Sequence, residues 1–119
     1  MPSRAWDLRI QDILEAIACI QQATAGMSYE EFEDLERLTL HGILYNFMIV
    51  GEAAVNVPDS IQSRYPQIPW RSMRDMRNVM VHEYFQVNLD RMWITIDEDL
   101  PSVVPLLEEL LQQERGEQG

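Results

Sequence analysis

Apolar side chains recur at intervals of three and four residues along most of this 119-residue chain, and strand-like alternation is missing over any useful length. Such spacing is typical of amphipathic α-helices. Residues 4–24 show it most simply, with an apolar stripe formed by Ile10, Ile13, Leu14, Ile17 and Ile20. The sequence therefore predicts an all-α fold, an up-and-down bundle of about five helices in a single domain spanning residues 1–119.

A glycine and a capping motif separate the first two expected helices. Gly26 ends the first one, because glycine accepts the left-handed conformation that a helix C-terminus often needs. Ser28 and Glu31 have the spacing of a capping box. The helix that they open is expected to run from residue 29 to about 56, where Pro58 stops it. Its second half is nearly uncharged, so we expect other helices or a second subunit to surround it.

Prolines divide the second half of the chain. Those within residues 58–69 forbid a regular helix, so we expect a short helical turn and then an irregular loop. A helix from residue 70 to about 83 comes next, and Asn88 is expected to cap a further helix. Pro101 and Pro105 would kink or restart that last helix.

The composition favours a cytoplasmic protein with no membrane partner. No run of about eighteen apolar residues is present, and the N-terminus lacks the apolar core of a secretory signal. The single cysteine, Cys19, cannot form an internal disulfide. Because Cys19 sits in an apolar helical stretch, we expect a small buried core residue rather than a nucleophile.

The net charge of −11 argues against strong non-specific binding of nucleic acid. Its distribution is uneven, because residues 64–91 carry five arginines against three carboxylates and are the only net-positive segment. The chain has no lysine, and the planar guanidinium of arginine suits bidentate phosphate contacts. Arg71 and Arg74 are therefore candidate phosphate or RNA contacts, although they could equally pair with the surplus acids.

Residues 69–85 group polar side chains in a pattern typical of a functional site. Arg77 and Tyr84 are seven residues apart, two helical turns, and Asn78 and His82 are four apart. On one helix these four side chains would form a polar ridge beside a stripe of methionines.

The spacing of this ridge resembles the signature of the HEPN superfamily: Arg77, four residues, His82, one residue, Tyr84. Two upstream stretches strengthen the resemblance, residues 50–54 and residues 64–70. Together they cover nearly the whole chain in the right order. Within the superfamily the chain resembles HepT, the toxin of the HepT/MntA toxin–antitoxin systems.

The residues of the ridge suit RNA cleavage without a metal. Two histidines and one cysteine, far apart in sequence, have no zinc-ligand spacing, so we expect no metal or cofactor. His82 can pass protons near neutral pH, and Arg77 can stabilise charge developing on a phosphate. The 2′-hydroxyl of RNA supplies the nucleophile, and the product would be a cyclic phosphate. Asn78 could orient the phosphate or His82, and Tyr84 could hold the phosphate or ribose.

The resemblance implies finer roles for these residues. HEPN ribonucleases are dimers whose two motifs face one cleft, with Arg77 and His82 as the catalytic pair here and Asn78 as an auxiliary residue. A homodimer would also supply a second histidine for acid–base catalysis. In HepT/MntA systems a minimal nucleotidyltransferase antitoxin transfers AMP from ATP onto the motif tyrosine, which would be Tyr84. The added charge and bulk would block RNA from the site.

The residues also allow a purely structural role for the motif and a different function for the protein. A histidine at a helix end can interact with free carbonyls, and a neighbouring arginine can simply bridge helices. Glu52, alone in an apolar run, is expected to pair with such an arginine rather than to act in catalysis. The alternative function is a non-catalytic helical binding subunit that docks a minimal nucleotidyltransferase, in keeping with the acidic surface.

Overall fold

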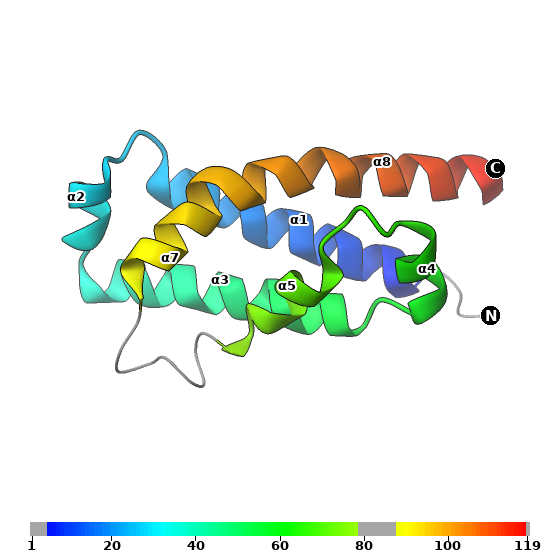
Figure 1. Cartoon of the computed structure of the whole chain (residues 1–119), viewed down its shortest axis with the longest axis horizontal. Helices are drawn as coiled ribbons and strands as arrows, with labels where there is room; N and C mark the ends of the chain where they lie inside the picture. The colour runs from blue at the N-terminus through cyan, green and yellow to red at the C-terminus, as the bar shows by residue number, and fades with distance from the viewer. Residues whose placement is uncertain (1–4, 79–87, 119) are drawn as a thin grey trace.

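The structure is a computed structural model that describes residues 5–78 and 88–118, and these residues are helical with short connections (Figure 1). Three long helices lie side by side: α1 (Ala5–Thr24), α3 (Arg37–Val55) and α8 (Leu100–Gln118). Helix α1 runs opposite to α3 and α8 and contacts both. The described residues contain no strand, so the expected all-α fold is confirmed.

The apolar stripe of α1 forms the centre of the core. Its isoleucines at positions 10, 13, 17 and 20 are almost completely buried against α3 and α8. Gly26 follows the helix with a φ of 75°, the left-handed conformation expected at that position. Cys19 is exposed, so the prediction of a buried cysteine was wrong. Position 19 lies outside the buried face of α1, which uses positions 13, 16, 17 and 20 instead.

The long helix expected from residue 29 to about 56 is broken in two, and that prediction was wrong. The capping box is present, since Ser28 Oγ accepts from Glu31 N at 3.2 Å and Ser28 N donates to Glu31 Oε1 at 2.9 Å. However, the helix that it opens, α2 (Tyr29–Glu33), is only five residues long, and a separate helix, α3, begins at Arg37. The break turns Phe32 into the core.

Helix α2 packs against the later helix α7 (Leu89–Ile94), which explains the break. The ring centroid of Trp93 lies 5.2 Å from that of Phe32 and 6.2 Å from that of Tyr29. Tyr29 Oη also donates a hydrogen bond to Asp90 Oδ1. A straight continuation of α3 would carry these rings away from α7.

The segment between α3 and the motif matches the expectation of a short helix and a loop. Helix α4 (Asp59–Arg64) follows Pro58, and α5 (Trp70–Asp75) begins after Pro69. Ile68 and Trp70 are buried, and Trp70 Nε1 donates to the backbone oxygen of Tyr65 at 3.0 Å. Both side chains belong to the hydrophobic core.

The C-terminal helices α7 and α8 follow one another without a loop, and the turn that joins them is wider than an α-helical turn. Asn88 caps α7 by accepting from Arg91 N at 3.0 Å, as expected. A π-helical turn, η1 (Thr95–Asp99), then leads into α8. It precedes Pro101, whose ring cannot fit the regular hydrogen-bonding pattern, and the wider turn absorbs that misfit. Pro105 is accommodated inside α8.

Helix α3 is the one helix among the described residues that is long and apolar enough to cross a membrane by length and composition alone. Seven of its residues, from Ile43 to Ala54, are buried in the protein core. The apolar character of α3 therefore has a structural use in the bundle, as in the core helix of many globular proteins.

Candidate active site at the contact between α3 and α5

The end of α5 lies directly on α3 at Gly51. A Cβ atom added to Gly51 would stand 2.7 Å from Arg77 Cβ, closer still to Arg77 N, and 3.0 Å from Arg74 O. Two of these atoms belong to the backbone and the Cβ is bonded directly to it, so moving them aside would cost much free energy. The position therefore requires glycine. At Gly42 in the same helix, by contrast, an added Cβ would meet nothing within 4 Å.

This contact also changes the expected motif helix. Helix α5 ends at Asp75, whereas the sequence predicted a helix from residue 70 to about 83. Met76 N bonds to Met73 O at 3.1 Å and Arg77 N to Arg74 O at 3.4 Å, which is the tighter i→i−3 pattern. The turn at residues 76–77 is therefore pressed against α3, and the expectation of one regular helix across it was wrong.

Arg77 is held by Glu52, the residue next to Gly51. Arg77 Nη1 donates to Glu52 Oε2 at 3.3 Å, which confirms the expected pairing of Glu52 with an arginine of the bundle. The two side chains are 45% and 57% exposed, so a ligand can reach them. An exposed pair of this kind contributes at most about 1 kcal/mol to stability. Its main effect is to fix the direction of the guanidinium.

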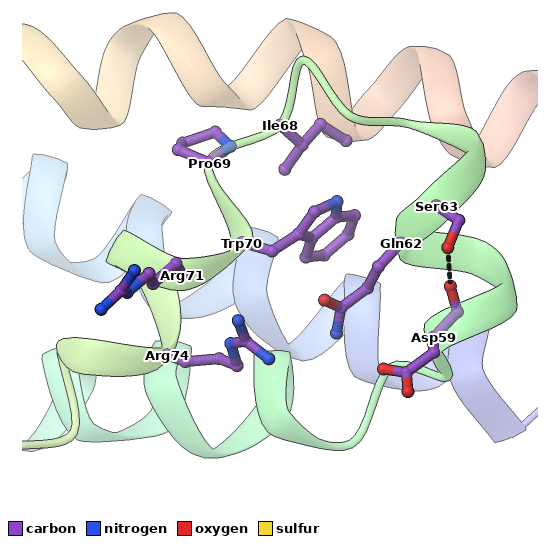
Figure 2. Close-up of a pocket in the computed structure, with 8 residues that line it drawn as sticks. All are labelled: Asp59, Gln62, Ser63, Ile68, Pro69, Trp70, Arg71 and Arg74. Atoms are coloured by element: carbon purple, nitrogen blue, oxygen red, sulfur yellow. Dashed lines mark hydrogen bonds between the residues drawn. The ribbon is translucent and has the colours of Figure 1, made fainter.

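Among the residues that the structure describes, Arg71 and Arg74 do not pair with the surplus acids. Neither side chain makes an ion pair or hydrogen bond within the part of the chain that the structure describes. Both line an open cavity of about 630 Å³ between α4 and α5 (Figure 2). Asp59 and Gln62 face this cavity from α4. Sequence reasoning missed these two residues, because only the fold brings α4 next to α5.

Asn78 is exposed just after the turn at residues 76–77 and lines a second cavity of about 700 Å³ with Asn88 and Arg91. The structure therefore brings Arg77 to α3, places Arg71 and Arg74 on one cavity, and places Asn78 on another. His82 and Tyr84, the other two residues of the predicted ridge, lie outside the described residues.

No group of three histidine, cysteine, aspartate or glutamate side chains in residues 5–78 and 88–118 could hold a metal ion. The described site offers three guanidinium groups. That of Arg77 is held by a carboxylate, and those of Arg71 and Arg74 line an open cavity and have no partner among these residues. Such groups bind anions, and phosphate above all.

The fold and this site define an all-α domain whose arginine-bearing helix α5 packs on α3. The sequence model of the family described as "Ribonuclease HepT-like" matches residues 13–110. A protein of Thermococcus cleftensis named as a probable ribonuclease HepT is 36% identical over 101 residues, covering 85% of this chain and 91% of that protein. A protein of Methanocaldococcus jannaschii named as a candidate RNase is 29% identical over 117 residues, covering 98% and 96%.

A third relative, from Caldanaerobacter subterraneus and also named as a candidate RNase, is 30% identical over 106 residues, covering 89% of this chain and 94% of its own. Among solved structures none matches the chain significantly. The chain belongs to the HepT-like family of the HEPN superfamily.

Proposed function

We propose that this protein is a metal-independent endoribonuclease, the toxin of a HepT/MntA-type toxin–antitoxin pair, acting in the cytoplasm. The observation that carries the proposal is the seating of Arg77. Its backbone packs on Gly51, and its guanidinium is directed by Glu52 while staying open to solvent. A cation fixed before the substrate arrives stabilises developing charge without reorganising. Membership of a family described as ribonucleases supports the same activity.

In the proposed reaction the 2′-oxygen of the RNA attacks the adjacent phosphorus, and the bond from phosphorus to the 5′-oxygen breaks. One histidine takes the proton of the 2′-hydroxyl, and the leaving 5′-oxygen gains a proton from a protonated histidine. The products are a 2′,3′-cyclic phosphate and a 5′-hydroxyl. Arg77 stabilises the charge on the phosphate oxygens, and His82 is the proton carrier. Asn78, Arg74 and Arg71 are auxiliary contacts to phosphate or RNA.

The proposal includes a homodimer, because one chain supplies few groups for both proton transfers. The outer face of α3 supports this assembly. Leu38, Tyr45 and Glu52 follow one another at seven-residue intervals, so they share one face. Leu38 is 74% exposed and Tyr45 53% exposed, so this face offers apolar surface that a second copy could bury. A second copy packed on this face would lie beside the ion pair of Glu52 and Arg77.

The proposal also includes control by a nucleotidyltransferase antitoxin. The antitoxin would join the hydroxyl oxygen of Tyr84 to the α-phosphorus of ATP and release pyrophosphate. The AMP group would add negative charge near Arg77 and exclude RNA. Co-expression with such a partner should add the mass of AMP to a peptide containing Tyr84. Labelling that survives Tyr84→Phe would show that the acceptor is another residue.

A second candidate function is a binding subunit that docks the nucleotidyltransferase and cleaves nothing. The net charge of −11 favours it, because an acidic surface repels RNA and suits a basic protein partner. On this alternative the acidic surface of the protein would contact the partner.

RNA cleavage in the presence of EDTA separates the two functions. The purified wild-type chain should cut single-stranded RNA, and His82→Ala should not. Circular dichroism of both proteins controls for folding. Equal cleavage by the two proteins, or cleavage by neither, removes the nuclease and leaves the binding subunit.

A further inference from the structure

The cavity between α4 and α5 combines a cation and hydrogen-bond acceptors on opposite walls. Figure 2 shows the guanidinium of Arg74 pointing across the cavity toward Gln62 and Asp59, while Arg71 extends to the other side. Ile68 and Pro69 add apolar lining. A ligand that fits would need an anionic end and a flat part with hydrogen-bond donors.

The amide side chain of Gln62 is fixed in place before any ligand binds. Gln62 Nε2 donates to the backbone oxygens of Val57 at 2.9 Å and Ala54 at 3.2 Å. Both bonds use the amide nitrogen, so Oε1 is the atom left to accept from a ligand. Ser63 Oγ donates to the backbone oxygen of Asp59 at 2.7 Å, which supports the backbone that carries the second acceptor. The Gln62 acceptor is thus preorganised, which reduces the entropy cost of binding.

The cation wall adjoins the proposed catalytic residue. Arg77 N bonds to Arg74 O at 3.4 Å, so the two arginines belong to one turn of chain. Arg74 has no carboxylate partner among the described residues, whereas Arg77 has Glu52. A single RNA strand that puts one phosphate on Arg77 can bring a neighbouring phosphate to Arg74.

We propose that this cavity is a nucleotide subsite that binds a guanosine next to the cleaved bond, with its phosphate on Arg74 and its base edge on Asp59 and Gln62. Guanine is the base whose Watson–Crick edge carries two adjacent donors, the N1–H and the N2 amino group. Two acceptors, a carboxylate and an amide oxygen, match that edge, and single-stranded RNA exposes it. The subsite rests on the proposed function, and it gives the nuclease a sequence preference.

The test uses short single-stranded oligonucleotides of 2′-fluoro nucleotides, which lack the nucleophile and stay intact. One has a single guanosine in a uridine background, and the other has uridine only. Fluorescence anisotropy measures binding at several salt concentrations. The wild-type chain should bind the guanosine oligonucleotide about tenfold more tightly, the discrimination typical of one well-formed base contact.

Two variants and one control assign the contacts. Asp59→Asn should lose most of the guanosine preference while binding the uridine oligonucleotide as before. Arg74→Gln should weaken binding of both about tenfold and lower the salt slope by about 0.7, the value for one phosphate contact on a single strand. The control is Arg37→Gln, an exposed arginine at the far end of α3, which should change neither quantity.

The subsite is overturned if Arg74→Gln binds like the wild type, if Asp59→Asn keeps the preference, or if the wild type binds neither oligonucleotide. Cleavage of ordinary RNA by the same wild-type preparation is read separately. A chain that cleaves RNA but ignores both substitutions keeps the proposed function and loses the subsite. A chain that binds as expected but cleaves nothing keeps the subsite and loses the nuclease.

Discussion

The ion pair of Glu52 and Arg77 orients the guanidinium group and adds little to stability. Both side chains are about half exposed, and a pair in that setting adds little to the stability of the fold. A guanidinium that must meet a phosphate at a defined angle nevertheless benefits from a fixed partner. In the proposed mechanism Glu52 is a positioning residue, and Arg77 would be the group that touches the substrate.

Replacing Glu52 by glutamine should therefore separate catalysis from binding. We expect Glu52→Gln to lower kcat about tenfold, because Arg77 loses its fixed direction, while the KM stays the same or falls with the loss of one negative charge. The free energy of unfolding should change by no more than about 0.5 kcal/mol. Steady-state cleavage kinetics and thermal unfolding measure the two effects. An unchanged kcat, equal to that of the exposed control Glu108→Gln, would contradict the positioning role.

The sequence indicated several residues of this candidate site but not the contacts that support them. The spacing of Arg77 and Asn78 in the motif, and the isolated charge of Glu52, were visible in the residue pattern. The need for Gly51 under Arg77 depends on a contact between two helices, and no pattern along the chain encodes it. Asp59 and Gln62 were missed for the same reason.

At the scale of elements, the end of α5 can pack on α3 because residue 51 is a glycine and has no side chain. We expect Gly51→Ala to destabilise the fold by about 2 kcal/mol, because the added methyl group must push the backbone at Arg77 aside. RNA cleavage should fall with it. Gly42→Ala is the matched control on the same helix and should stabilise the protein by up to about 1 kcal/mol, since its Cβ meets nothing. Denaturant unfolding measures both, and equal effects at the two positions would refute the close contact.

The contact between α2 and α7 should be sensitive to alkaline pH. The hydrogen bond to Asp90, together with desolvation and nearby carboxylates, raises the pKa of Tyr29 from 10.0 to about 12. A raised pKa means that the neutral phenol is favoured in the folded state, so its contribution is complete below pH 10 and is lost as the pH approaches 12. Ultraviolet titration should show late tyrosine ionisation, and Tyr29→Phe should reduce its amplitude by the absorbance of one phenolate. A late step of unchanged amplitude in Tyr29→Phe would exclude this assignment.

The two expected helices that proved to be interrupted, residues 29–56 and 70–83, show why helix boundaries were harder to predict than the helices themselves. Between Ser28 and His41 the sequence has no glycine or proline to indicate the interruption after α2. The break is stabilised by aromatic contacts with Trp93, about sixty residues further along the chain. The caps at Ser28 and Asn88 were predictable, because they depend only on residues within one turn.

At the scale of the whole molecule, the outer face of α3 makes a prediction about assembly. We expect the wild-type chain to sediment at about twice its mass of 13.9 kDa. Tyr45→Glu should sediment as a monomer and lose RNA cleavage, because a charge at this exposed position prevents packing of the second copy without disturbing the core. Leu8→Glu, at an exposed position of α1, is the control and should remain a dimer. A wild-type monomer that still cleaves RNA would remove the homodimer from the mechanism.

Arg77 is proposed to stabilise the transition state of RNA cleavage, and the cleavage rate without its guanidinium tests that role. We expect Arg77→Ala to reduce the single-turnover rate of RNA cleavage in EDTA by a factor of about a hundred or more, with the thermal unfolding of the chain nearly unchanged. Cleavage by Arg77→Ala at the wild-type rate would contradict the account.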